Sequence, residues 1–133
     1  MADKEKHDEK EKKIDLVGRY KNELDSIMQI QAVDGSSFYG TYHTAVSAKG
    51  TSLVAQMNGK YNESDTPGEG VIAFSVNWKY VKDEKNVFST SSWNGIVRKN
   101  GQIHTMWLLT RYCPALVGWN ATSIGYNIFT KMQ

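Results

Sequence analysis

Apolar and polar residues alternate along much of this chain, and positions 72–79 show the alternation most clearly. Ile72, Phe74, Val76 and Trp78 share one side of an extended strand, and Ala73, Ser75, Asn77 and Lys79 share the other. Successive side chains of a β-strand point to opposite faces, so this period of two predicts a strand with an apolar inward face. Between the turn signals, no segment has apolar residues at helical spacing over a length sufficient for a helix.

Turn signals rich in Gly, Pro, Asn and charged residues interrupt the alternation at short intervals. Seven such breaks lie at positions 23–25, 34–35, 49–50, 62–70, 82–85, 100–101 and 114–118. They leave eight segments of strand length, and short, evenly spaced strands indicate a sandwich or an up-and-down barrel. We expect an all-β fold, an eight-stranded antiparallel up-and-down β-barrel, because a closed meander leaves no open edge and has room for one small ligand.

Several predicted inward faces carry polar side chains among aromatic ones. A buried polar group without a partner costs about 1–3 kcal/mol, so these side chains either bond to one another and to trapped water or await a polar ligand. An aromatic pocket with a few convergent polar groups is the usual small-molecule site. The polar set on the apparent core faces is Asn22, Ser26, Tyr42, Thr44 and Asn127, and the sixth segment is expected to turn Asn86, Phe88, Thr90 and Ser92 inward.

The last two segments are apolar on both faces. Their outward apolar residues are Met106, Leu108, Ile124, Tyr126 and Ile128. A barrel exterior of this character is expected to be covered by another subunit. The alternative is a scatter of surface apolar residues, which soluble proteins tolerate.

The length and the charge of the chain indicate its domain organisation and the kinds of partner to expect. The chain of 133 residues is expected to form one domain over 14–133, behind a solvated tail over 1–13 in which acidic and basic residues alternate. The net charge of +2 comes with no basic stripe, so nucleic acid is not an expected partner. No apolar stretch approaches the roughly 20 residues of a membrane span, so no membrane partner is expected. Without an apolar signal-peptide core, the chain as written is expected in the cytoplasm, and secretion is expected if a leader has been removed.

The residue pattern gives little support for a metal site or for a catalytic nucleophile. Cys113 is the single cysteine, which excludes an intrachain disulfide, and His7, His43 and His104 do not have metal-ligand spacing. An enzyme would need a nucleophile–base pair or paired carboxylates facing the cavity, and the nearest candidate is Glu84 at the rim. We therefore expect a binding protein that is not an enzyme and has no metal or cofactor.

An ordered set of short motifs runs from position 16 to position 131. Its pieces are GRYKNELDS at 18–26, GTYHTAV at 40–46, VNWK at 76–79, TMWLL at 105–109, WNAT at 119–122 and GYNIFT at 125–130. Each piece alone is weak, but the ordered set includes three tryptophans at fitting separations. Together the motifs resemble the avidin and streptavidin family of biotin-binding proteins.

The resemblance implies a site for the two rings of biotin. Asn22, Ser26 and Tyr42 match three donors to the ureido oxygen, and such donors favour its polarised form as an oxyanion hole does. Thr44 and Asn127 match the acceptors of the two ureido N–H groups. The other matched contacts are Leu24 beside the rings, Trp78, Phe88 and Trp107 as aromatic walls, Asn86 near the thioether sulfur, Ser47 and Ala48 over the ligand's tail, and Trp119 from a neighbouring subunit.

The chain departs from the family pattern near the tail of the ligand. Asn86 replaces a Thr that contacts the sulfur, and Glu84 and Val81 replace two serines that bind the valerate carboxylate. The stretch from Trp78 to Phe88 is also one residue longer than in the pattern. An acid at this point is expected to repel the carboxylate.

The function implied by the resemblance is high-affinity, noncovalent binding of free biotin or of a biotinylated protein. The match of Trp119 to a residue that completes the site of a neighbouring subunit implies a homotetramer, a dimer of dimers. The alternative is a lipocalin-like barrel that binds another small apolar ligand, but a fatty-acid site would not need the five inward polar side chains.

Overall fold

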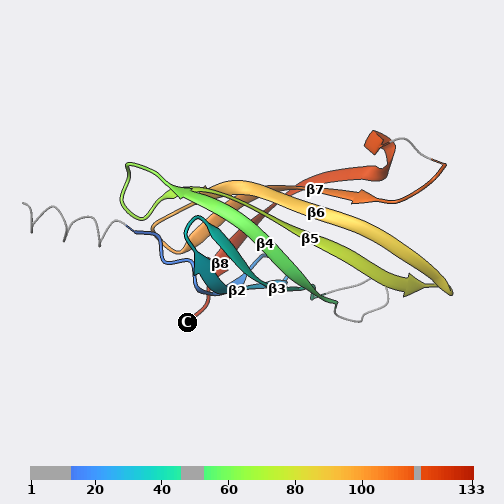
Figure 1. Cartoon of the computed structure of the whole chain (residues 1–133), viewed down its shortest axis with the longest axis horizontal. Helices are drawn as coiled ribbons and strands as arrows, with labels where there is room; N and C mark the ends of the chain where they lie inside the picture. Colours follow the sequence, from blue (N-terminus) through green and yellow to red (C-terminus); the bar gives the residue numbers. More distant parts are fainter. Residues whose placement is uncertain (1–12, 46–52, 116–117) are drawn as a thin grey trace, which may run out of the picture.

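Over residues 13–45, 53–115 and 118–133, which the structure describes, this computed structural model is a closed barrel of eight antiparallel strands in sequence order (Figure 1). The strands are β1 Gly18–Lys21, β2 Ile27–Asp34, β3 Ser37–His43, β4 Val54–Glu63, β5 Gly70–Lys82, β6 Lys85–Val97, β7 Gln102–Arg111 and β8 Thr122–Lys131. A short 3-10 helix, η1 Gly118–Ala121, precedes β8. No helix in the described part of the chain is long and apolar enough to cross a membrane. The predicted fold is confirmed.

The predicted breaks coincide with the connections between strands, to within a residue or two at the strand ends. The break at 49–50 falls between β3 and β4, outside the described residues. In the connection between β5 and β6, Lys82 pairs with Lys85, and the two residues between them, Asp83 and Glu84, have φ angles of 52° and 64°. Two left-handed residues in a two-residue loop match the type I′ turn, whose twist suits a β-hairpin.

This turn fixes the register of the longest hairpin in the barrel. Trp78 lies opposite Ser89 and Lys79 lies opposite Phe88. Directly paired residues share a face of the sheet, and Trp78 belongs to the buried face of β5. The prediction that the sixth segment turns its even-numbered residues inward is therefore wrong. The outward residues are Asn86, Phe88, Thr90 and Ser92, and the inward ones are Ser89, Ser91, Trp93 and Val97.

The inward faces of the strands form the hydrophobic core of the barrel. β5 alternates buried and exposed residues from Gly70 to Lys79, as its sequence predicts. At the end of the barrel where β3 begins, the Phe38 ring lies 6.3 Å from the rings of Tyr61 and Phe74. Burial of one such side chain contributes about 1.5–3 kcal/mol. The opposite end, where β3 finishes and β4 begins, carries the polar inward residues.

The barrel closes through a short seam between β1 and β8. Two residue pairs form it, Tyr20 with Lys131 and Lys21 with Thr130. Lys131 Nζ donates to the Asp15 carbonyl oxygen at 2.9 Å and lies 5.8 Å from the Tyr20 ring centroid. Just beyond β8, the Met132 N–H donates to the Arg19 carbonyl oxygen of β1 at 2.7 Å, which adds a backbone link to this short seam.

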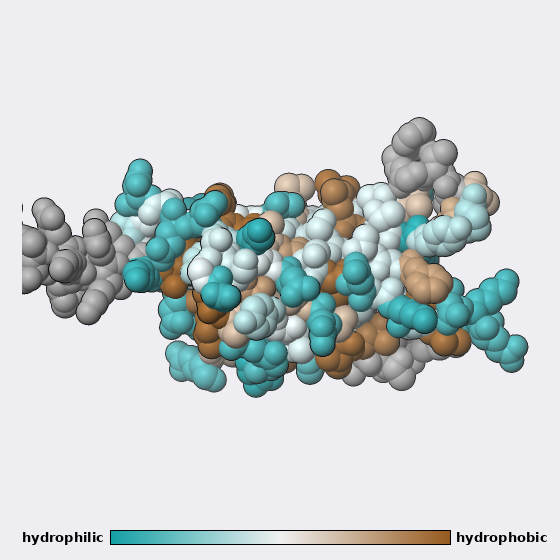
Figure 2. All heavy atoms as spheres, viewed as in Figure 1, coloured by the Kyte–Doolittle hydropathy of each residue, from teal (hydrophilic) through white to brown (hydrophobic). Residues whose placement is uncertain are grey.

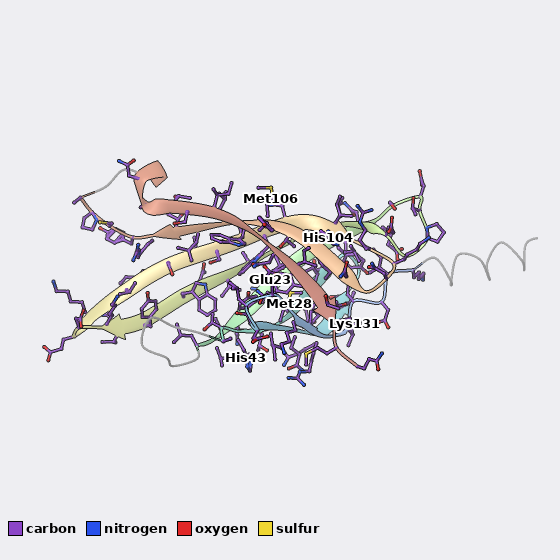
Figure 3. All side chains as sticks on the ribbon, turned by 180° about the vertical axis from the view of Figure 1, so that it is seen from behind. Glu23, Met28, His43, His104, Met106 and Lys131 are labelled. Atoms are coloured by element: carbon purple, nitrogen blue, oxygen red, sulfur yellow. The ribbon has the colours of Figure 1, made fainter. Side chains whose placement is uncertain are left out.

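The outer faces of β7 and β8 are apolar, as predicted. Met106, Ile124 and Tyr126 are 57%, 66% and 72% exposed, and Met106 pairs with Tyr126 across the two strands. Met106 projects from the outside of the barrel in Figure 3. The face turned toward the viewer in Figure 2 is a mixture of hydrophilic and hydrophobic residues. An apolar outer surface of this kind is unusual on a monomer.

Candidate functional site

Asn22, Ser26 and Tyr42 form a hydrogen-bonded group at one end of the barrel. Asn22 follows β1, Ser26 precedes β2, and Tyr42 lies near the end of β3. Asn22 Nδ2 donates to the Tyr42 hydroxyl oxygen at 3.3 Å, and Asn22 Oδ1 accepts from the Leu24 and Ser26 N–H groups at 2.9 and 3.0 Å. The three side chains are buried. The structure thus brings together three of the five predicted polar residues.

The Tyr42 hydroxyl is held in its protonated form. Burial raises the pKa of Tyr42 to about 12, against the lowering effect of a hydrogen bond with Ser26. The Glu23 carboxylate also raises this pKa, and the hydrogen bond from Asn22 lowers it. The phenol therefore remains a hydrogen-bond donor through neutral and moderately alkaline pH.

Asn127 lies on the inward face of β8 and uses both ends of its side-chain amide. Its Oδ1 accepts from Trp93 Nε1 at 3.1 Å, and its Nδ2 donates to Glu23 Oε1 at 2.7 Å. Its backbone carbonyl accepts from Thr105 Oγ1 at 2.9 Å. A buried amide with partners on both ends is held in one orientation.

Stacked aromatic rings connect these two polar groups. Trp93 stacks on Tyr42 with ring centroids 4.9 Å apart and on Phe74 with centroids 5.0 Å apart. The Trp78 ring meets Tyr42 edge-on at 5.9 Å, and Trp78 Nε1 donates to Ser91 Oγ at 3.2 Å. Offset or edge-on aromatic pairs are each worth about 0.5–1.5 kcal/mol beyond their burial, so the assembly is stiff.

Trp107 and Thr44 lie at the same end of the barrel, and both are partly buried. Trp107 packs against Gly125, where a Cβ atom would lie 2.2 Å from the indole, so glycine is required for this packing. Thr44 Oγ1 accepts from the Leu53 N–H at 3.0 Å and donates to the Leu53 carbonyl at 3.4 Å. The Thr44 hydroxyl therefore holds the end of β3 to the chain before β4.

Asn86 and Phe88, predicted as site residues, point away from the interior. Asn86 is exposed, and Phe88 is 46% exposed with Lys79 Nζ 5.7 Å from its ring centroid. The stretch between Trp78 and Phe88 contains one residue more than the family pattern. A shift of one residue in a strand moves every side chain to the other face, which explains why the predicted inward face of β6 is wrong.

The other predicted contacts lie at the edge of the described region or beyond it. Leu24 is in the β1–β2 connection and is 66% exposed. Ser47 and Ala48 lie outside the described residues, and Trp119 is described through its backbone in η1, without its side chain. Roles for these residues stay predictions.

Three residues near the site were missed by the sequence analysis: Ser91, Trp93 and Glu23. Ser91 and Trp93 are 4% and 5% exposed inside the barrel. Pairing residues outward from the Asp83–Glu84 turn would have placed both on the face of Trp78. No local signal marks Glu23, because its partner Asn127 is 104 residues away in the chain.

Comparison with known proteins decides the family. The model of the avidin family matches residues 10–132. The chain belongs to the avidin family. Avidin from Gallus gallus is 34% identical over 128 residues, which cover 92% of this chain and 81% of that protein. Avidin-related protein 4/5 from the same species is 33% identical over 127 residues, covering 91% of this chain and 80% of that protein.

A solved structure agrees with this assignment. The crystal structure of xenavidin matches the chain with a TM-score of 0.72 and 28% identity, covering 89% of this chain and 98% of xenavidin. Avidin-family proteins are binding proteins and not enzymes. Among the described residues, no group of three or more His, Cys, Asp or Glu side chains is placed to hold a metal ion.

Proposed function

We propose that this avidin-family chain binds biotin tightly and noncovalently at the polar end of its barrel. The observation that carries the proposal is the buried, hydrogen-bonded group of Asn22, Ser26 and Tyr42 beside stacked aromatic rings. In this proposal the donors of Asn22, Ser26 and Tyr42 converge on a single strongly polar oxygen, the ureido carbonyl of biotin. Membership of the avidin family supports the same ligand.

We assign the two ureido N–H groups to Thr44 and Asn127 as acceptors. A carbonyl or hydroxyl oxygen has two lone pairs. At Asn127 Oδ1 the Trp93 indole takes one, and at Thr44 Oγ1 the Leu53 N–H takes one. Each oxygen therefore retains capacity for a further N–H donor.

The rings of Trp78, Trp93 and Trp107 are the proposed apolar walls. Trp93 takes the place that the sequence pattern gave to Phe88, because its ring lies in the interior. Since stacking and hydrogen bonds hold these walls before any ligand arrives, little ordering entropy is lost on binding. This preorganisation is the physical basis of the proposed tight binding.

We also propose that a second subunit completes the site. The exposed apolar residues of β7 and β8 offer a surface for assembly into a homotetramer, a dimer of dimers. In that assembly Trp119 of one subunit closes the pocket of its neighbour. Biotinylated proteins are proposed as partners besides free biotin.

Retention on immobilised biotin tests the proposal. The folded chain is expected to bind the matrix and to be blocked by an excess of free biotin. Octanoate, which has a carboxylate tail and no urea, is expected to have no effect. A folded chain that flows through the matrix rejects the proposal, and competition by octanoate points to the lipocalin-like alternative.

A further inference from the structure

Arg111 is a cation on the inward face of the barrel at its polar end. It pairs with Ser89 across β6 and β7, and Ser89 pairs with Trp78 across β5 and β6. Directly paired residues share a face of the sheet, so Arg111 lies on the face of the buried Trp78 side chain. The β5–β6 turn and the end of β7 lie at the same end of the barrel (Figure 1). Arg111 therefore lies at the mouth of the proposed site.

The backbone at Arg111 is fixed, and the residue is exposed. The Tyr112 N–H donates to the Phe88 carbonyl oxygen at 2.8 Å, which continues the β6–β7 pairing beyond Arg111. The salt bridges within the described part of the chain are those of Lys21, Arg98 and Lys131, and Arg111 takes part in none of them. A guanidinium keeps its charge throughout the pH range of proteins. The charge of Arg111 is therefore available to an anion that enters with a ligand.

The spacing along β7 places Arg111 near the tail of a bound ligand. Trp107, a proposed wall for the rings, lies four residues before Arg111 on the same inward face. A strand rises about 3.3 Å per residue, so the two residues are about 13 Å apart along β7. Ser91 pairs with Leu109 in the row between them. A ligand whose urea meets Tyr42 and whose rings lie against Trp107 directs its flexible tail along this row toward Arg111.

The charged residues at the tip of the β5–β6 hairpin are farther from that tail. Lys82 pairs with Lys85, and Lys85 is four residues from Ser89, about 13 Å along β6. Asp83 and Glu84 form the turn beyond this pair. Charges in water are largely screened beyond about 8–10 Å at physiological salt. The turn thus places Glu84 too far away to repel a carboxylate near Ser89 strongly.

We propose that Arg111 recognises the negatively charged tail of the ligand and makes free biotin the preferred ligand over its neutral amides. The inference rests on the proposed function, since it concerns the tail of the same ligand. A guanidinium attracts a carboxylate by charge and donates hydrogen bonds to it. The amide that links biotin to a protein carries no charge. Biotinylated proteins therefore bind to this chain less tightly than the free acid does.

The closing experiment compares the affinities of biotin and of its primary amide, measured by competition, for the full chain and for Arg111→Gln. We expect Arg111→Gln to lower the preference for the acid by about three- to fivefold, the scale of one exposed ion pair. The loss is expected in the affinity for the acid alone, because the neutral amide does not interact with the charge. A ratio of two affinities is insensitive to a general loosening of the site.

Two other cations provide matched controls, and both variants are expected to keep the ratio. Lys79→Gln removes a charge from the outer face of the same hairpin, where Lys79 Nζ lies 5.7 Å from the Phe88 ring centroid. Arg98→Gln removes a charge at the opposite end of β6, where Arg98 pairs with Glu69 at 3.6 Å.

A salt titration of the unaltered chain tests the same contact without a substitution. Raising the salt concentration from about 0.1 M to about 1 M shortens the Debye length from about 10 Å to about 3 Å. The preference of the unaltered chain for the acid is expected to fall over this range, and that of Arg111→Gln is expected to fall less.

A preference that is unchanged in Arg111→Gln, or that falls equally in Lys79→Gln, overturns the inference while leaving biotin binding intact. Equal affinity of the unaltered chain for the acid and the amide overturns it as well. Failure of the unaltered chain to bind either ligand is a different result and rejects the proposed function.

Discussion

Tyr42 joins the polar and the aromatic parts of the site. Its hydroxyl accepts from Asn22, and its ring stacks on Trp93, whose indole in turn donates to Asn127. Four of the five polar residues predicted from sequence, Asn22, Ser26, Tyr42 and Asn127, are therefore linked through hydrogen bonds and the stacked rings of Tyr42 and Trp93. At the residue scale, the proposed binding requires donors that remain protonated and acceptors that retain a free lone pair.

Removal of single donors tests the polar group. Tyr42→Phe and Ser26→Ala are each expected to weaken biotin binding by roughly ten- to hundredfold, because a lost hydrogen bond to a strongly polar oxygen costs about 1–3 kcal/mol. Tyr39→Phe is the matched control, since Tyr39 is 47% exposed on the outer face of β3. Dissociation rates measured by competition provide the readout, and unchanged rates in both variants contradict the assignment.

The raised pKa of Tyr42 predicts the alkaline behaviour. Burial brings this pKa to about 12, so the phenol remains neutral while an unfolded tyrosine ionises near pH 10. The contribution of Tyr42 to stability is therefore present below the unfolded pKa and falls as the pH rises toward the folded value. Biotin dissociation is expected to be constant from pH 7 to about pH 10.5. A rise centred on the ordinary tyrosine pKa would show that Tyr42 is not shielded as described.

At the scale of the elements, β5 and β6 show what sequence can and cannot predict. The alternation in β5 identified its inward face correctly, because one face is fully apolar. β6 has small hydroxyl residues on both faces, Ser89 and Ser91 inward and Thr90 and Ser92 outward, so its pattern did not specify which face is buried. The two-residue turn at Asp83 and Glu84 decides it. The contact between Glu23 and β8 could not be predicted at all, because closure of the barrel brings together distant segments.

The assignment of the odd-numbered residues of β6 to the inward face can be tested directly. Trp93→Ala removes an interior ring that stacks on Tyr42 and Phe74, and it is expected to cost about 3–5 kcal/mol of stability and to weaken biotin binding. Phe88→Ala is the paired variant, and it is expected to change both quantities little because the ring is on the outer face. Chemical denaturation and biotin dissociation measure the two effects. The reverse order of effects would restore Phe88 as a wall of the site.

In the whole molecule, the two ends of the barrel differ in the side chains that they bury. The end near Phe38 is packed with apolar side chains and supports the fold, and the end near Tyr42 carries the polar residues. The outer surface of β7 and β8 adds a third feature, an apolar face that one barrel leaves exposed. Assembly through that face would place several sites in one particle.

A charge on this face tests the proposed assembly. Tyr126→Asp is expected to convert the proposed tetramer into smaller species, because a carboxylate buried in an apolar interface lacks a partner. The variant is also expected to release biotin faster, since Trp119 of the neighbouring subunit is lost. Sedimentation gives the mass, with Tyr39→Asp on the outer face of β3 as the control. An unaltered chain that sediments as a monomer contradicts the assembly.

The most direct test of the central claim is a calorimetric titration of the folded chain with biotin. Hydrogen-bonding groups fixed around one end of an aromatic barrel predict one biotin per chain and a dissociation constant in the nanomolar range or below, about −12 kcal/mol or stronger. No binding heat together with no protection against thermal unfolding by biotin would contradict the account.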